Sequence, residues 1–198
     1  MKNKKLLFVV NVDWFFLSHR LPIAKEALKQ GWDVYVTAKN TGRVDEIETN
    51  GIKYIDLPIS RSGTNLKNEF KILLHLCKIY KSIKPDIVHH ITLKPVIYGS
   101  IISRIFKIKG TLNAISGLGY NFTGDRKTAI QKVMITLMRF GFKQKNINFI
   151  FQNNDDYNQL KALNVFADTN KINFIKGSGV DLDIFKAHPL PNSKRIKI

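Results

Sequence analysis

Short apolar runs alternate with segments of helical spacing along most of the chain, and this alternation limits the possible folds more than any other feature. Residues 6–10 form a continuous apolar run, and residues 17–30 then place leucine and alanine at helical spacing before Gly31. Residues 34–38 and 54–57 are two further strand-like runs with a short helical segment between them. Parallel neighbours need helical crossovers, and strands that are covered on both faces are continuously apolar. The amino-terminal third therefore predicts a parallel α/β sheet.

The same alternation continues to residue 175. The pattern predicts a long helix that ends near Ile83, then strands at 87–88, 111–115, 147–151 and 172–175, separated by helices at 95–106, 127–142 and 155–163. A chain of 198 residues with 44% apolar composition can bury one full core. We expect one doubly wound, Rossmann-like domain with a mainly parallel sheet of about seven strands in residues 1–187. Residues 188–198 lose all periodicity and predict the start of an interdomain linker.

Polar side chains and glycines follow two of the expected strands. We expect His89, His90 and Lys94 just beyond the strand at 87–88, while Ser116 and Gly117 follow the strand at 111–115. In an open parallel sheet, ligands bind outside the carboxyl ends of the strands, where the strand order reverses. The middle of the chain therefore predicts one wall of a ligand cleft.

The charge is strongly positive. The chain has 32 lysines and arginines against 15 acidic residues, a formal net charge of +17 and a pI near 10.0. Such a surface attracts polyanions, anionic lipid or phosphorylated ligands. The basic helix at 127–142 is interleaved with apolar residues, which is typical of a helix on an anionic membrane and equally of a core helix with a solvated basic face. Nucleic acid is the rival polyanion, but no helix-turn-helix, zinc-finger or RNP signature is present.

Several classes of site are disfavoured. No G-x-G-x-x-G follows the first strand, which argues against a dinucleotide cofactor. Adjacent histidines on a strand point to opposite faces, and no cysteine or carboxylate cluster accompanies them, so we expect no metal. The G-x-S-x-G pattern of a serine hydrolase fails at Lys176. No apolar run approaches the roughly 20 residues that span a bilayer, and the lone Cys77 suits a reducing compartment.

Five segments together resemble a known family. They are residues 16–22, residues 86–95 with Gly99, residues 113–119, residues 151–156, and residues 177–181 with Phe185. With these segments the chain resembles the amino-terminal domain of a GT-B glycosyltransferase of the family 4 type. It is most similar to bacterial enzymes that extend capsular, O-antigen or other lipid-linked oligosaccharides.

The resemblance implies a two-domain enzyme that transfers a sugar from a nucleotide-sugar donor with retention of configuration, without a metal or other cofactor. In that family the amino-terminal domain binds the acceptor, here expected to be a polyprenyl-diphosphate-linked saccharide. The carboxyl-terminal domain, which this sequence does not include, supplies most donor contacts. We therefore expect a cytoplasmic protein at the inner face of the plasma membrane, with the nucleotide sugar, the acceptor, the anionic membrane and a separate donor-binding domain as partners.

The resemblance also implies a set of site residues but no catalytic residue. The acceptor-binding cleft would contain His19, His90, Lys94, Ser116, Gly117 and Gly119, and the interdomain face would contain Asn153 and Ser178. The first strand–helix turn lacks the glycines of many relatives, and Ser116 stands where many have histidine. Alone, the chain is predicted to bind acceptor weakly and to transfer nothing. The alternatives are a non-catalytic binding module of a split enzyme and a basic nucleic-acid-binding protein.

Overall fold

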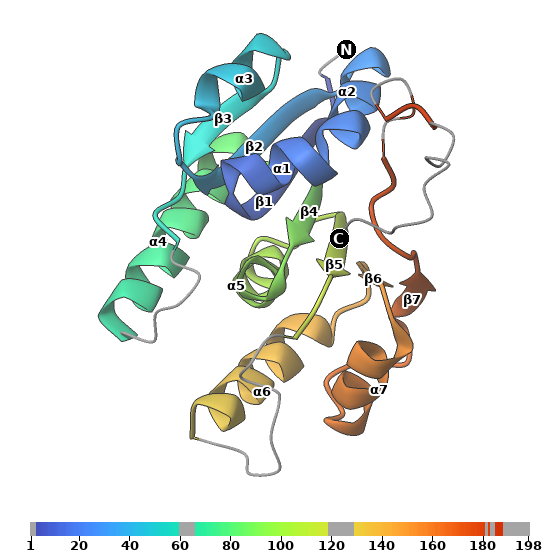
Figure 1. Cartoon of the computed structure of the whole chain (residues 1–198). Coiled ribbons are helices and arrows are strands. Elements are labelled where there is room, and N and C mark those ends of the chain that lie inside the picture. The colour runs from blue at the N-terminus through green and yellow to red at the C-terminus, as the bar shows by residue number, and fades with distance from the viewer. Residues whose placement is uncertain (1–2, 60–65, 119–128, 181, 183–184, 188–198) are drawn as a thin grey trace.

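The described part of the chain forms one parallel sheet with helices on both faces (Figure 1). This computed structural model describes residues 3–59, 66–118, 129–180, 182 and 185–187. Every hydrogen-bonded strand pair within it is parallel, and the order is β3-β2-β1-β4-β5-β6-β7. The strands are β1 (Lys5–Val12), β2 (Asp33–Lys39), β3 (Lys53–Asp56), β4 (Ile87–Ile91), β5 (Gly110–Ile115), β6 (Ile147–Phe151) and β7 (Lys171–Phe174). The predicted fold class is confirmed.

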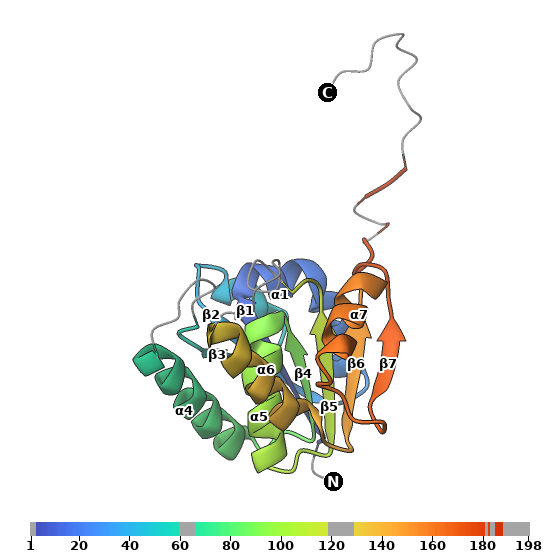
Figure 2. The ribbon, with the colours of Figure 1, turned by 90° about the horizontal axis from the view of Figure 1, so that it is seen from below.

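The helices divide between the two faces of the sheet. One face carries α1 (Asp13–His19), α2 (Leu21–Lys29) and α3 (Val44–Thr49), which pack on one apolar cluster. The other carries α4 (Leu66–Ile83), α5 (Leu93–Ile105), α6 (Ala129–Phe142) and α7 (Asn154–Ala162), which pack on a second and larger cluster. Figure 2 shows this second group of helices in front of the strands. Parallel sheets are buried on both faces, which explains why their strands are continuously apolar.

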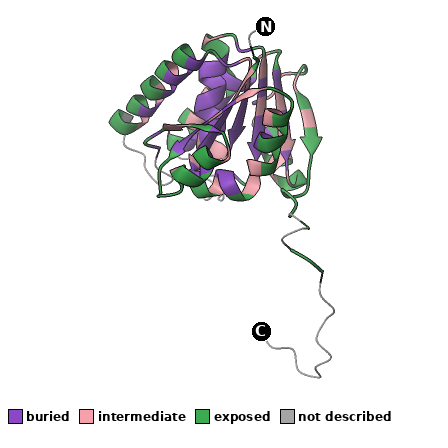
Figure 3. Ribbon diagram, turned by 90° about the horizontal axis from the view of Figure 1, so that it is seen from above, coloured by how far each residue is buried: buried purple, intermediate pink, exposed green. Residues whose placement is uncertain are grey.

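Helix α5 is the most buried helix on its face. Every residue from Pro95 to Ser103 is buried, and α5 packs between α4 and α6. Figure 3 shows the buried residues in the central strands and in one central helix, while the outer helices expose one side. Gly99 permits this approach, because a β-carbon at that position would overlap the ring of His90 on β4. Because α5 packs this closely, it covers one face of β4 and excludes solvent from that face.

Two local predictions were wrong. The helix expected at 17–30 is two helices that meet at Arg20, because Pro22 has no N–H to donate to the carbonyl of Ser18. The strand expected at 87–88 extends to Ile91, so His89 and His90 lie inside β4 and not beyond its end. Their backbones pair with β1 on one side and β5 on the other, and such pairing does not depend on side-chain polarity. The linker predicted at 188–198 lies outside the described residues.

Candidate functional site

A cavity of about 810 Å³ lies on the face of the sheet that carries α1, α2 and α3. Side chains of β1, β4, β5 and β6 form its floor, with Phe8, His89 and Leu112 in one row because they pair in register. Residues of α2 form one wall, and residues 175–179 form the other. The floor includes β1 and β4, the two strands at which the strand order reverses, and this is the position where open α/β sheets bind ligands.

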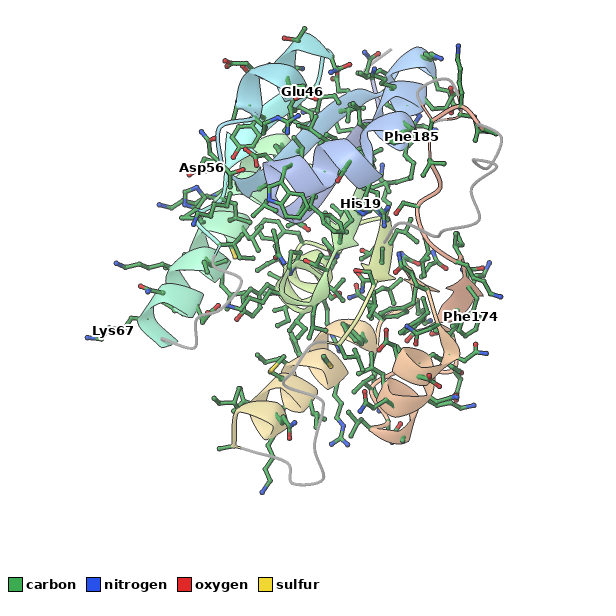
Figure 4. All side chains as sticks on the ribbon, in the orientation of Figure 1. His19, Glu46, Asp56, Lys67, Phe174 and Phe185 are labelled. Carbon is green, nitrogen blue, oxygen red and sulfur yellow. The ribbon has the colours of Figure 1, made fainter. Side chains whose placement is uncertain are left out.

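The cavity changes character along the strands. At the amino ends of the strands it is lined by Leu6, Trp32 and Ile87, which are apolar. At the carboxyl ends it is lined by polar side chains, those of His19, Arg20, Ser116, Gln152 and Ser178. His19 stacks on Phe15 with 4.0 Å between ring centroids and lies at the carboxyl end of α1 (Figure 4). The structure therefore brings together three predicted site residues, His19, Ser116 and Ser178.

Arg20 lies at the break between α1 and α2 and is only 8% exposed. Its Nη1 donates hydrogen bonds to the carbonyl of His19 at 2.8 Å and to the hydroxyl of Ser178 at 2.9 Å. Its buried Nε has no hydrogen-bond partner in the described residues. Burial lowers the pKa of the guanidinium, but arginine remains charged. Arg20 lies in the segment 16–22 that carries the family resemblance, but it was not among the predicted site residues; Pro22 two residues later marks the helix break that places it at the cavity.

His89 also faces the cavity and is 5% exposed. Its ring meets that of Phe8 edge to face, with 5.5 Å between centroids, and neither ring nitrogen makes a hydrogen bond of normal geometry in the described residues, although the backbone of Leu112 acts on the ring. Burial and, to a smaller extent, the charge of Arg20 lower the pKa of His89 to about 3. The imidazole is therefore neutral at physiological pH and offers one donor and one acceptor nitrogen.

His90 points to the opposite face of the sheet and is fully buried under α5. Its Nδ1 lies 2.7 Å from Oδ1 of Asn113, and its Nε2 lies 2.6 Å from the hydroxyl of Tyr80. An amide oxygen can only accept, so Nδ1 donates to Asn113 and Nε2 accepts from Tyr80. Asn113 in turn donates to Ser100 at 2.8 Å. The structure thus gives His90 no access to the cavity, and its predicted acceptor contact is replaced by a closed internal network.

Lys94 lies at the start of α5 and does not line the cavity. Its Nζ is 2.7 Å from Oε1 of Glu69, and the hydroxyl of Tyr98 donates to Oε2 of the same carboxylate at 2.7 Å. Burial and the charge of Glu69 raise the pKa of Tyr98, so the phenol stays protonated. Thr92, just before this helix, has a φ of 73° and a ψ of 159°, a region that a β-branched residue rarely adopts. This group joins α4 to α5 beyond the end of β4.

Two further predicted positions, Gly117 and Asn153, lie outside the cavity lining. Gly117 follows Ser116 at the carboxyl end of β5, and a β-carbon added there would meet no described atom within 4 Å beyond its chain neighbours. Asn153 is exposed and caps α7, where its Oδ1 accepts from the backbone N–H of Asp156 at 2.8 Å. Gly119 lies outside the described residues. Binding by any of these residues stays a prediction.

The part of the chain that the structure describes contains neither a cluster of potential metal ligands nor a membrane-spanning helix. Those residues contain no group of three or more histidine, cysteine, aspartate or glutamate side chains that could hold a metal ion. No helix among them is both long and apolar enough to cross a bilayer.

The parallel sheet, with a cavity where its strand order reverses, defines a doubly wound α/β domain, and comparison with known proteins identifies its family. Residues 5–154 match the family model described as "Glycosyl transferase 4-like". The match covers most of the chain, and the chain therefore belongs to this glycosyltransferase family. The resemblance expected from the sequence motifs is confirmed.

A curated relative and two solved structures extend this result. UDP-Gal:alpha-D-GlcNAc-diphosphoundecaprenol alpha-1,3-galactosyltransferase of Escherichia coli is 25% identical over 154 residues, which are 78% of this chain and 38% of the relative. A glycosyltransferase from Rickettsia africae ESF-5 has a TM-score of 0.60 at 19% identity, over 96% of this chain and 47% of that one. UDP-GlcNAc 2-epimerase from Neisseria meningitidis, bound to UDP-GlcNAc, has a TM-score of 0.55 at 19% identity, over 85% and 45%.

These structural likenesses show the fold, which is one Rossmann-like half of a GT-B architecture. The chain spans less than half of the length of each of these three proteins. Activities, substrates and partners of the whole proteins are therefore considered below as a proposal.

Proposed function

We propose that the chain is the acceptor-binding half of a retaining glycosyltransferase. The complete enzyme transfers a sugar from a nucleotide-sugar donor to a polyprenyl-diphosphate-linked saccharide in the synthesis of a cell-surface polysaccharide such as capsule or O-antigen. It works at the cytoplasmic face of the plasma membrane and needs no metal or organic cofactor. A donor-binding domain completes the site, and without it the chain binds acceptor weakly and transfers nothing.

The observation that carries this proposal is the cavity over β4 and β5, whose polar end lies at the carboxyl ends of these strands, in a chain that belongs to a glycosyltransferase family. Its polar end presents hydroxyl, amide and imidazole groups from Ser116, Gln152 and His19. Such groups bind the hydroxyls of a saccharide through hydrogen bonds. The relative from Escherichia coli bears a name that specifies a diphosphoundecaprenol-linked sugar acceptor, which supports a lipid-linked acceptor for this chain.

A basic and apolar surface supports the membrane location. Helix α4 exposes Phe70 by 61% and Leu74 by 47%, and α6 exposes Val133 by 55%. Exposed basic residues alternate with these positions on both helices, namely Lys67, Lys71, Lys78, Lys81, Lys132 and Arg139. Figure 4 shows Lys67 projecting from the outer end of α4. Each basic residue close to an anionic surface contributes about 1 kcal/mol to binding, and buried apolar side chains add to this attraction.

The experiment is co-sedimentation with liposomes at physiological salt. Vesicles of neutral lipid, vesicles with anionic lipid, and anionic vesicles that contain an undecaprenyl-diphosphate-linked N-acetylglucosamine are compared. We expect binding to anionic vesicles and at least threefold tighter binding when the acceptor is present. Equal binding with and without the acceptor would contradict an acceptor-binding domain.

Substitutions test the surface itself. Phe70→Ser and Val133→Ser each remove an exposed apolar side chain from the basic helices, and we expect each to weaken binding to anionic vesicles severalfold. Phe185→Ser is the matched control, since Phe185 is 64% exposed on the chain after β7 and lies away from α4 and α6 (Figure 4). If the control weakens binding as much as the other two variants, the membrane does not contact α4 and α6.

A further inference from the structure

Arg20 is a buried cation without a counter-charge in the described residues. It is 8% exposed, forms no ion pair there, and its hydrogen bonds go to a carbonyl and a hydroxyl, which are neutral acceptors. Glu26, the acidic residue in the cavity lining, is largely exposed and lies beside Lys29 on the same helix. Burying a charge without a partner is costly, so buried charges in proteins are normally paired. The position of Arg20 therefore indicates an anion that binds from the cavity.

Several donors converge at this end of the cavity. Within the described residues, the buried Nε of Arg20 has no hydrogen-bond partner, and the His89 ring, which interacts with the backbone of Leu112, lines the same cavity. Arg20 is also the N-cap of α2, a helix of nine residues whose amino end carries a partial positive charge, although Pro22 in its first turn has no N–H to donate. Ser178 completes the set with a hydroxyl held by Arg20 at 2.9 Å. These groups come from three separate parts of the chain and line one cavity.

We infer that Arg20, His89, Ser178 and the amino end of α2 form a binding site for a phosphate group. Guanidinium matches the geometry of phosphate oxygens, and a helix amino terminus binds the same anion. The inference builds on the proposed function, in which both substrates carry a diphosphate. The phosphate belongs either to the nucleotide-sugar donor or to the polyprenyl diphosphate of the acceptor.

The experiment measures binding of inorganic pyrophosphate by calorimetry at physiological salt, which suppresses attraction to the overall positive charge. We expect the unmodified chain to bind pyrophosphate and Arg20→Gln to bind it at least tenfold more weakly. Lys29→Gln is the matched control, because it removes one positive charge from the exposed side of the same helix. We expect this control to change affinity by less than twofold, and equal weakening by both variants would overturn the site.

A second measurement does not depend on the stability of a variant. Arginine Nε–H resonances are followed by NMR during titration with pyrophosphate, and Arg20→Lys, which keeps the charge, assigns the Arg20 signal. We expect the Arg20 resonance to shift more than those of Arg43 and Arg104, which are exposed in the structure. A larger shift of either exposed arginine, or no shift of Arg20, would overturn the inference.

Further titrations identify the source of the anion. Tighter binding of UDP than of pyrophosphate assigns the site to the donor, whereas tighter binding of farnesyl diphosphate assigns it to the lipid-linked acceptor. Glutamate that binds as tightly as pyrophosphate would show a carboxylate site and would contradict the inference. The pyrophosphate result does not depend on vesicle binding. If the chain binds pyrophosphate but the acceptor does not strengthen vesicle binding, only the proposed function is contradicted. If the acceptor strengthens vesicle binding but the chain does not bind pyrophosphate, only this site is contradicted.

Discussion

The two adjacent histidines of β4 make the folded state sensitive to mild acid. Both are buried, and their pKa values are lowered to about 3 for His89 and about 4 for His90. Burial is the main cause for each, and the charge of Arg20 adds to the effect at His89. In the unfolded chain a histidine titrates near pH 6.5, so below that pH the unfolded state takes up protons that the folded state does not.

The sign and size of the effect follow from this difference. A histidine with a lowered folded pKa contributes no destabilisation above pH 6.5, and its destabilisation grows as the pH falls from 6.5 to the folded pKa. A pH of 5.0 lies about 1.5 units below the unfolded pKa of each histidine, which corresponds to about 2 kcal/mol. The two together should lower the free energy of unfolding by about 4 kcal/mol between pH 7.5 and pH 5.0. That loss is a large fraction of the stability of a typical domain.

Urea denaturation followed by circular dichroism measures the effect at both pH values. His89→Leu isolates one of the two contributions, because leucine removes the titrating ring and loses only its interaction with the backbone of Leu112. We expect this variant to fold and to show about half of the pH dependence, roughly 2 kcal/mol. Gln30→Leu is the control, since it places leucine in the wall of the same cavity without removing a titrating group.

The reasoning would be refuted by either of two results. The first is a free energy of unfolding that changes by less than about 1 kcal/mol between the two pH values, which would mean that the histidines are hydrated or paired in the folded state. The second is an unchanged pH dependence in His89→Leu, which would place the titrating group elsewhere.

Three further predictions concern packing, a buried hydrogen-bonded carboxylate and backbone strain. Gly99→Ala should cost about 1–3 kcal/mol of stability in urea denaturation. The same change made together with His90→Ala should cost almost nothing further, and an equal cost in both backgrounds would show that the His90 ring is not the obstacle. Asp13→Ala should cost about 2 kcal/mol and speed amide exchange at Thr41, whose N–H and hydroxyl both bond to that carboxylate, and unaltered exchange would contradict this. Thr92→Gly should leave stability unchanged or raise it by up to about 1 kcal/mol, and a clear loss on thermal denaturation would show that the positive φ is not strained.

The strand arrangement could be predicted from the sequence because it depends on local signals. Buried parallel strands are apolar along their whole length, and the intervening helices show their own spacing, so all seven strands of the described sheet were located within a few residues. The errors fell where a local signal was misleading. Two polar residues indicated an end of the strand at Val88, yet pairing with β1 and β5 continues through His89 and His90.

The composition of the site was less accessible. Alternation along a strand predicts that His89 and His90 point to opposite faces, and they do. Which face is open depends on where α5 packs, and that is decided by Gly99 and the apolar side of the helix. The partner of Lys94 is Glu69, which is 25 residues earlier and on another helix. No motif around Lys94 indicates this ion pair.

The topology of the sheet explains why the polar end of the cavity combines residues that are far apart in the sequence. The strand order β3-β2-β1-β4-β5 reverses direction between β1 and β4. The crossover after β1 and the segment after β5 therefore approach the carboxyl ends of the strands from opposite sides of this reversal. The first contributes His19 and Arg20, and the second contributes Ser116. The chain after β7 then adds Ser178, which Arg20 holds. The reversal of strand order therefore determines the site more than the composition of any one loop.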